Sequence, residues 1–388
     1  MKIVAYCLLI TVALFSCKKS KDAPAPVTVV TPPVNPPEVA KALVYTGYSD
    51  TALGIGRKGM ATAALGNKIF FAGGMIETGS AAGGPLQRTN TDKIDIYDVQ
   101  TGKWSSAKLS HPSAYLAAAA AGSKVIFAGG TDGNGHAWNT ADIYDTLTGQ
   151  IKTDTLSLGR YSLAAAAAGG KIVFAGGGYA VSAISAVVDI YDVQTGKWTK
   201  SALSSPRYYL SGAAAGNTMI FAGGINSSGG FVADADIYDV QKGSWAHASL
   251  SEGRQAIAAA AAGNKIAFGG GRNNGLSSAI DIYDIQSATW STTNLNGPRS
   301  EMAAAGIGDR IIFAGGSDAY GTANIMQVYD IQTEKMLPYP FLLKEKRYEL
   351  SAAAAGNKLL VAGGSDRIII GTSIGYYNYR TVDFFEWK

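Results

Sequence analysis

A run of small residues, a short apolar segment and a pair of glycines recur seven times along this chain of 388 residues. The copy at 163–178 reads LAAAAAGGKIVFAGGG, and the glycine pairs begin at 73, 129, 176, 223, 270, 315 and 363. Successive pairs are 56, 47, 47, 47, 45 and 48 residues apart. Such a period indicates a repeat architecture, in which each copy forms one unit that buries its apolar face against its neighbours.

Each copy contains four segments of strand length separated by turns. In the copy that starts at Arg160, RYSLAAAAAG is followed by KIVFAGG, a variable loop, VDIYDVQ, the turn TG and KWTKSALSSP. Four such segments predict a four-stranded antiparallel sheet. Alanine favours helices, but each run is short and ends at glycine. We therefore interpret the alanine runs as innermost strands that crowd around a common axis, where only small side chains fit.

An aromatic pair has a fixed place in the copies. A tryptophan follows a tyrosine by seven residues in four of them, at Tyr97 and Trp104, Tyr191 and Trp198, Tyr238 and Trp245, and Tyr283 and Trp290. A double glycine followed by a tyrosine and a tryptophan separated by six residues resembles the kelch repeat, and the resemblance covers residues 43–388. It implies an all-β fold, a seven-bladed kelch-type β-propeller.

The two ends of the repeat region complement each other. The last copy stops at Lys388 one strand short, whereas LVYTGYSDTALGIGR precedes the first copy as a surplus. We expect the N-terminal strand to complete the last blade as its outer strand and close the ring. Tyr48 precedes Arg57 by nine residues, as the tryptophans precede the equivalent positions, so Tyr48 is expected in the tryptophan position.

The chain before the repeats indicates export and anchoring. Residues 1–16 are expected to be a signal peptide, because Lys2 precedes an apolar stretch, 3–15, that is too short to span a bilayer. LFSC, ending at Cys17, resembles the bacterial lipobox and implies a lipoprotein with a type II signal peptide, lipidated at Cys17. An ordinary signal peptide or anchor is the alternative. Residues 17–42 hold the basic KKSKD and six prolines and predict a stiff tether.

These features place the protein in the bacterial cell envelope, with the lipid anchor in the membrane as one partner. The outer membrane is the expected site, on its periplasmic or its outer surface, and the lysines of KKSKD favour the periplasmic side. The net charge of +4 is small and forms no basic block, so no nucleic acid is expected as a partner.

The sequence predicts no metal and no cofactor. His111, His136 and His247 lie in different copies without the spacing of metal ligands. Galactose oxidase has kelch-like blades too, but it needs copper and a cysteine cross-linked to tyrosine. The only cysteines here, Cys7 and Cys17, lie at or before the predicted lipidation site. The propeller therefore has no cysteine for such a cross-link, and a copper oxidase of this kind is not expected.

An arginine lies sixteen residues before six of the seven glycine pairs, and Ser113 takes its place in the remaining copy. A ring of cations at the mouth of a channel could attract an anionic ligand. A residue that is copied with the repeat needs only a structural reason, however, such as a tie to a carboxylate or carbonyl of a neighbouring blade. Both interpretations concern the same candidate channel-mouth arginines: Arg57, Arg160, Arg207, Arg254, Arg299 and Arg347.

The loops that depart from the repeat form the second candidate site. The loops at 75–93 and 365–381 are longer than their equivalents and belong to the first and last blades, which are neighbours across the seam. The loop at 131–140 carries a tryptophan outside the repeated motif. Aromatic and arginine side chains suit protein hot spots and sugar platforms, although the loops could merely cover the seam. The candidate ligand-binding residues of this loop face are Arg88, Trp138, Arg367, Tyr376, Tyr377, Tyr379 and Arg380.

Two functions from different classes follow. The favoured one is a membrane-tethered, non-catalytic module that binds a protein or a glycan through the loop face. The alternative is an enzyme that acts on an acidic sugar, similar to the periplasmic sialate mutarotases with kelch repeats. Such chemistry needs an acid, a base and an arginine to hold the carboxylate, and Glu252, Glu301 and Glu349 lie near the arginines in the sequence.

Overall fold

The computed structural model describes residues 42–78, 86–180, 183–338, 340–370 and 373–388. Lys41–Lys388 forms one compact unit. The predicted signal peptide, Cys17 and the tether lie outside the described residues. In the described part of the chain, no helix has the length and apolar character that crossing a membrane would require.

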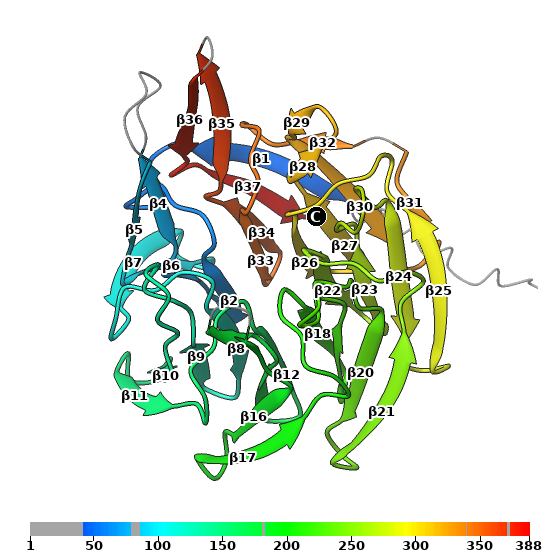
Figure 1. Cartoon of the computed structure of the whole chain (residues 1–388). Coiled ribbons are helices and arrows are strands. Elements are labelled where there is room, and N and C mark those ends of the chain that lie inside the picture. The colour runs from blue at the N-terminus through cyan, green and yellow to red at the C-terminus, as the bar shows by residue number, and fades with distance from the viewer. Residues whose placement is uncertain (1–41, 79–85, 181–182, 339, 371–372) are drawn as a thin grey trace, which may run out of the picture. The chain divides into compact units, whose positions relative to one another are not determined.

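Seven antiparallel sheets follow one another around a central axis, and they form the blades of a propeller (Figure 1). Their strands from the inside outward are, for blade 1, β2 (Ala61–Leu65), β3 (Lys68–Ala72), β6 (Lys93–Asp98) and β7 (Lys103–Lys108); for blade 2, β8 (Ala117–Ala121), β9 (Lys124–Ala128), β10 (Thr140–Asp145) and β11 (Ile151–Thr155); for blade 3, β12 (Ala164–Ala168), β13 (Lys171–Ala175), β16 (Val187–Asp192) and β17 (Lys197–Ala202); and for blade 4, β18 (Ser211–Ala215), β19 (Thr218–Ala222), β20 (Asp234–Asp239) and β21 (Ser244–Ser249).

Blades 5 to 7 complete the ring, with an outer strand in blade 6 that is broken in two. Their strands are, for blade 5, β22 (Ala258–Ala262), β23 (Lys265–Gly269), β24 (Ala279–Asp284) and β25 (Thr289–Asn294); for blade 6, β26 (Ala303–Ile307), β27 (Arg310–Ala314), β30 (Ile325–Asp330) and the short β31 (Lys335–Met336) and β32 (Phe341–Leu342); and for blade 7, β33 (Ser351–Ala355), β34 (Lys358–Ala362), β37 (Val382–Trp387) and β1 (Leu43–Ser49).

The expected closure of the ring is confirmed. β1 pairs antiparallel with β37 as the outer strand of blade 7, and the inner strands β2 and β33 contact each other across the seam. The expectation for Tyr48 is wrong. Tyr45 takes the tryptophan position instead: it lies opposite Phe385, just as Trp198 of blade 3 lies opposite Tyr191. A register shift, which marks a bulge, follows between Tyr45 and Gly47. Tyr45 precedes Arg57 by twelve residues and not by nine, because the bulge adds one residue and the connection from β1 to Arg57 adds two.

The alanine runs form the innermost strands, as predicted. Ala164 and Ala166 lie in the core shared with blade 4, whereas Ala165 and Ala167 pack against the core shared with blade 2. Space between neighbouring inner strands is small. A Cβ atom added to Gly306 of β26 would lie 1.8 Å from the carbonyl oxygen of Ala261. Successive positions of one strand therefore face two different neighbours, and both neighbours require small side chains.

The glycine pairs connect neighbouring blades. Gly129 and Gly130 both have positive φ, 73° and 92°, and a Cβ on Gly129 would lie 2.3 Å from the carbonyl oxygen of Arg160. The amide of Gly130 donates to that carbonyl at 2.8 Å, and the amide of Gly364 donates to Arg57 O at 3.0 Å across the seam. Glycine is needed for both the conformation and the close approach.

The connections between the second and third main strands carry short hairpins on one face, the loop face. One is β14 (Gly178–Ala180) with β15 (Ala183–Ile184). The others, labelled in Figure 1, are β4 (Met75–Thr78) with β5 (Gln87–Asn90), β28 (Ser317–Asp318) with β29 (Gly321–Thr322), and β35 (Ser365–Ile370) with β36 (Ser373–Asn378). β36 contacts β4, and β29 contacts β35, so the hairpins of blades 6, 7 and 1 are neighbours.

Candidate functional site

The repeated arginines are buried inside their own blades. Arg57, Arg160, Arg207, Arg254 and Arg347 are 0% exposed and Arg299 is 3% exposed. Arg254 Nη2 lies 2.6 Å from Asp281, and Arg57 Nη2 lies 2.8 Å from Asp95. The other carboxylate partners are Asp189 of Arg160, Asp236 of Arg207 and Asp383 of Arg347. Because these guanidinium groups are buried, they do not form an open ring of cations at the channel mouth that could attract an anionic ligand.

The arginine contacts explain the spacing of sixteen residues. Arg57 Nε donates to Gly73 O at 2.6 Å, and Arg347 Nη1 donates to Gly363 O at 3.0 Å. Arg160 and Arg299 bind the first glycine of their copies in the same way, whereas Arg207 and Arg254 donate to Phe221 O and Phe268 O, two residues before that glycine. The backbone carbonyl of every one of these arginines accepts a hydrogen bond from the second glycine of the preceding blade. We refer to these buried side chains and their partners as the arginine layer. The layer has a structural role.

Two blades break the arginine layer in opposite ways. In blade 2, Ser113 replaces the arginine, and its hydroxyl donates to Gly129 O at 3.1 Å. Asp142 of that blade stays buried and accepts from the Ser110 amide at 2.9 Å and from Thr153 Oγ1 at 2.7 Å. In blade 6, Arg299 pairs with the neutral Gln327 at 2.5 Å, and burial lowers the pKa of Arg299 to about 10.

The residue two positions after each arginine, or after Ser113 in blade 2, lies at the mouth of the central channel. All seven have positive φ, between 49° and 62°. Six backbone hydrogen bonds of 2.8–3.3 Å connect neighbours in this set, for example from Glu349 N to Glu301 O and from Gly59 N to Glu349 O. We call the set the mouth ring, and it comprises Gly59, Tyr115, Ser162, Tyr209, Ala256, Glu301 and Glu349.

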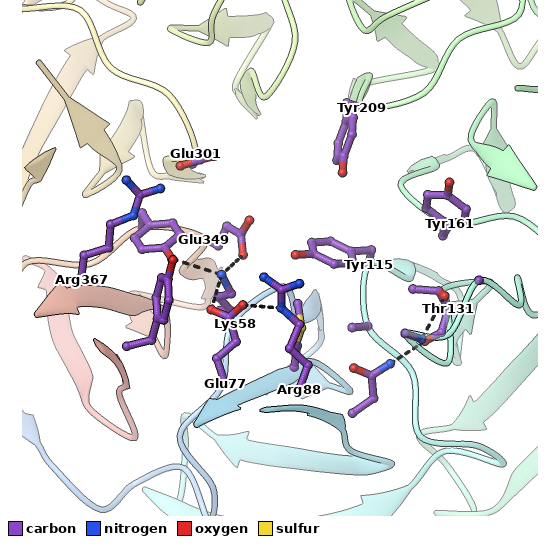
Figure 2. Close-up of a pocket in the computed structure, with 17 residues that line it drawn as sticks. Lys58, Glu77, Arg88, Tyr115, Thr131, Tyr161, Tyr209, Glu301, Glu349 and Arg367 are labelled. Carbon is purple, nitrogen blue, oxygen red and sulfur yellow. Dashed lines mark hydrogen bonds and ion pairs between the residues drawn. The ribbon is translucent and has the colours of Figure 1, made fainter. Parts of the chain in front are cut away.

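The mouth ring and the hairpins of blades 7 and 1 surround a cavity of about 480 Å³ (Figure 2). Tyr115, Tyr209, Glu301 and Glu349 reach it from the ring, and these four also line a second space of about 500 Å³ toward the channel. A non-glycine residue in the left-handed region costs free energy. Side chains are retained here despite that cost, which favours a role for them in the cavity.

Lys58 forms the centre of a charged cluster on one wall of the cavity. Its Nζ lies 2.8 Å from Glu77, 3.3 Å from Glu349 and 3.2 Å from the hydroxyl of Tyr348. Glu77 also accepts from Arg88 Nε at 2.8 Å, across the β4–β5 hairpin. Lys58 and Glu77 are almost completely buried, whereas the Arg88 side chain is 59% exposed. Arg88 is therefore the most exposed member of the cluster, followed by Glu349 with a side chain that is 22% exposed.

The cluster sets the charge states of its members. Burial alone would raise the pKa of Glu77, but hydrogen bonds from Lys58 and Arg88 outweigh it and hold that pKa below its ordinary value. Burial alone would lower the pKa of Lys58, but Glu349 and Glu77 raise it instead. The pKa of Glu349 is raised, mainly by burial and also by the charge of Glu301, although Lys58 opposes the shift. The cavity thus contains fixed charges and one carboxyl group disposed to take up a proton.

The structure brings together three of the seven loop residues that were predicted to bind a ligand. Arg88, Arg367 and Tyr376 line the cavity, and Figure 2 shows Arg88 and Arg367 reaching it from different hairpins. The other four do not line it: Trp138 stacks on His111 with ring centroids 4.2 Å apart, Tyr377 and Tyr379 pack edge to face, and Arg380 is exposed elsewhere.

Lys58, Glu77, Tyr115 and Tyr209 line the cavity but were not selected from the sequence. A signal for three of them was available. The two positions after each arginine carry different residues from copy to copy, although the rest of the inner segment is nearly constant. When the residue type at one position varies although the rest of the repeat is nearly identical, the packing of the scaffold does not determine that residue type. Glu77 lies in an irregular hairpin, where no repeat position can be assigned.

The described residues hold no group of three His, Cys, Asp or Glu side chains that could bind a metal ion. Of the three carboxylates considered for catalysis, Glu301 and Glu349 line the cavity. Glu252 does not. It lies 3.5 Å from Arg254 and accepts from Asn273 at 3.1 Å.

Two family models match the chain. The one described as the KLHDC2/KLHL20/DRC7 Kelch-repeats domain matches residues 116–316, just over half of the chain, and the Kelch motif matches residues 56–108. No curated protein matches the sequence. Kelch propellers typically serve as protein-interaction modules. By its sequence and by its seven blades, this chain belongs to the kelch-repeat family that the first of these models describes.

Proposed function

We propose that the propeller is a non-catalytic binding module that receives a protein or glycan ligand on its loop face, at the cavity between the hairpins of blades 7 and 1. One observation carries this proposal. The side chains that line the cavity come from the positions at which the copies differ, namely the two residues after each arginine and the irregular hairpins. The residues that the copies share are buried in the scaffold. Loops on a rigid scaffold are the usual place of recognition.

The test is capture of a ligand by residues 41–388, which form one compact unit. We would immobilise this domain and compare it with Arg88→Ala and Tyr209→Ala, using envelope extract fractionated into protein and glycan. Arg380→Ala is the matched control, because Arg380 is exposed but does not line the cavity. We expect both cavity variants to lose a ligand that the control retains. Equal capture by all variants would place recognition elsewhere.

The proposed function includes tethering to the membrane through a lipidated Cys17 and the segment 17–42. The support is in the sequence, where LFSC follows an apolar stretch and a proline-rich segment follows Cys17. Cys17→Ala is expected to abolish lipidation and to move the full chain from the detergent phase to the aqueous phase. Wild-type partitioning of this variant would reject the anchor and, with it, the proposed location at the outer membrane.

A second candidate, an acidic-sugar mutarotase, has a specific observation in its favour. Glu301 and Glu349 both reach the cavity, the pKa of Glu349 is raised by burial, and two arginines are available for a sugar carboxylate. Mutarotation opens and recloses the sugar ring, for which an acid protonates the ring oxygen while a base takes the proton of the anomeric hydroxyl. NMR exchange spectroscopy on N-acetylneuraminate distinguishes the candidates. An enzyme accelerates anomer exchange and loses this activity in Glu349→Gln, whereas a binding module has no effect on the rate.

A further inference from the structure

The loop face has a further cavity beside the cavity of about 480 Å³, which is called the first cavity below. The two share three lining residues, of which one is an arginine. The further cavity, called the second cavity below, has a volume of about 560 Å³ and lies along the hairpins of blades 6 and 7. Glu301, Tyr348 and Arg367 line both cavities, so Arg367 stands at their junction. Each volume suits a small organic group. A groove of two such spaces in series fits an extended ligand better than a compact one.

Cations that lack a carboxylate partner lie along the second cavity. Arg272, Lys346 and Arg367 are exposed, and within the described residues none of them has an ion-pair partner. The nearby carboxylates instead accept hydrogen bonds from the protein. Asp318 accepts from the Tyr320 amide at 2.8 Å, and Glu301 accepts from Ser317 Oγ at 3.1 Å. The free guanidinium and ammonium groups therefore have donors to offer to carboxylates of a ligand.

Aliphatic side chains are few among the described residues that line this groove. Met75 and Ala114 contribute them to the first cavity, and Leu276 contributes one to the second. Protein partners usually anchor large apolar side chains in dry pockets, and the described lining residues form no such pocket. Tyrosines predominate instead, with Tyr209, which is 38% exposed, in the first cavity and Tyr320, which is 100% exposed, at the lip of the second. Tyr348 at the junction is buried against Lys58. A tyrosine provides an apolar ring face and a hydroxyl, which suits a sugar ring.

We propose that the ligand is an acidic oligosaccharide that lies across Arg367 and occupies both cavities. This inference rests on the proposed binding function and names its ligand class. The carboxylate groups of the sugar accept from Arg367 and from Arg88 or Lys346 on either side, and its ring faces lie against the tyrosines. The length of the groove requires more than one sugar unit, and its cations require at least one carboxylate.

The probes are trigalacturonate, monogalacturonate, methyl-esterified trigalacturonate and triglutamate, titrated calorimetrically into residues 41–388. An array of acidic oligosaccharides, each with its neutral counterpart, precedes the titration and replaces trigalacturonate by the strongest acidic sugar. We expect the trimer to bind at least about tenfold more tightly than the monomer or the ester, since one charge-assisted contact accounts for that factor. Arg367→Gln and Lys346→Gln should each lower the affinity for the trimer, while Arg380→Gln should leave this affinity unchanged.

Several results would overturn the inference. These are an array without any acidic hit, equal affinity for the trimer and its ester, equal affinity for the monomer and the trimer, or tighter binding of triglutamate. Unchanged affinity in a folded Arg367→Gln variant would also reject it. The proposed function would survive these results if the Arg88→Ala and Tyr209→Ala variants still lost a captured ligand. Failure of that capture as well would reject both.

Discussion

The arginine layer and the mouth ring are two residues apart in the sequence, and they differ in what determines them. The arginine layer is nearly the same in every copy, and its side chains are enclosed by carboxylates and carbonyl oxygens of the same blade. The mouth ring has a constant backbone, with positive φ throughout, but five different residue types. Repetition of a side chain therefore indicates a scaffold role. Repetition of a backbone conformation with varied side chains indicates a surface available for recognition.

The strongest test of this comparison removes one arginine. Arg160→Ala leaves Asp189 buried without its cation, and loss of one partner of a buried ion pair costs about 3–5 kcal/mol. Urea unfolding should show this loss in the free energy of unfolding. Ser162→Ala, two residues further on in the mouth ring, is the control and should change stability by less than about 0.5 kcal/mol. Similar effects of the two variants would contradict the distinction.

Blade 6 offers the opposite experiment, because its arginine has a neutral partner. Gln327→Asp should supply the carboxylate that Arg299 lacks and raise the free energy of unfolding by about 1–3 kcal/mol. Gln327→Asn has the same size as the aspartate but no charge, so it separates charge from packing. If both variants were destabilised equally, blade 6 would have adapted its packing to glutamine, and the missing charge would be of no consequence.

Two glycine substitutions in the mouth ring should separate stability from binding. Ala256→Gly and Tyr209→Gly each remove the conformational strain of a non-glycine residue with positive φ. Because glycine also has more conformational freedom in the unfolded chain, the free energy of unfolding should rise by at most about 1 kcal/mol. Only Tyr209→Gly removes a side chain that lines the main cavity, and only this variant should lose ligand. Thermal melts and ligand capture on the same samples test both statements.

The smallest expected effect is the pH dependence of Glu349. Because burial raises the pKa of Glu349, the folded protein binds its proton more tightly than the unfolded chain does, and stability falls as pH rises from the ordinary glutamate pKa through the raised one. Glu349→Gln removes this cost. The variant should exceed wild type by less than about 1 kcal/mol at pH 7, and the difference should disappear toward pH 4. A difference that grows on acidification would show that Lys58 dominates instead.

Much of the scaffold was predictable because the repeat supplies seven observations of each position. The alanine runs, the glycine pairs and the outer strand from the N-terminus were predicted correctly, since steric crowding and closure act in every blade. The register of β1 was not, because a bulge between Tyr45 and Gly47 depends on how one strand meets Phe385 and Asp383. No other copy contains that bulge to reveal it.

The site was less predictable for a related reason. Arg88, Arg367 and Tyr376 come together because β36 lies beside β4, with Asn378 Nδ2 donating to Glu77 O at 2.6 Å. Sequence composition could show that these loops are unusual, but it could not show which of their side chains turn inward. Trp138 illustrates the difference, since its ring is engaged by His111 and His136 and does not reach the cavity.

The sequence by itself determined the number of blades, the closure at the seam and the small side chains around the axis, because these follow from local spacing and from volume. The tertiary structure alone decided the role of the arginines, since burial and the carboxylate partner come from strands about 30 residues away. It also decided the composition of the cavity. The electrostatics of Lys58, Glu77 and Glu349 arise where the first and last blades meet, and no local pattern encodes a contact across nearly the whole chain.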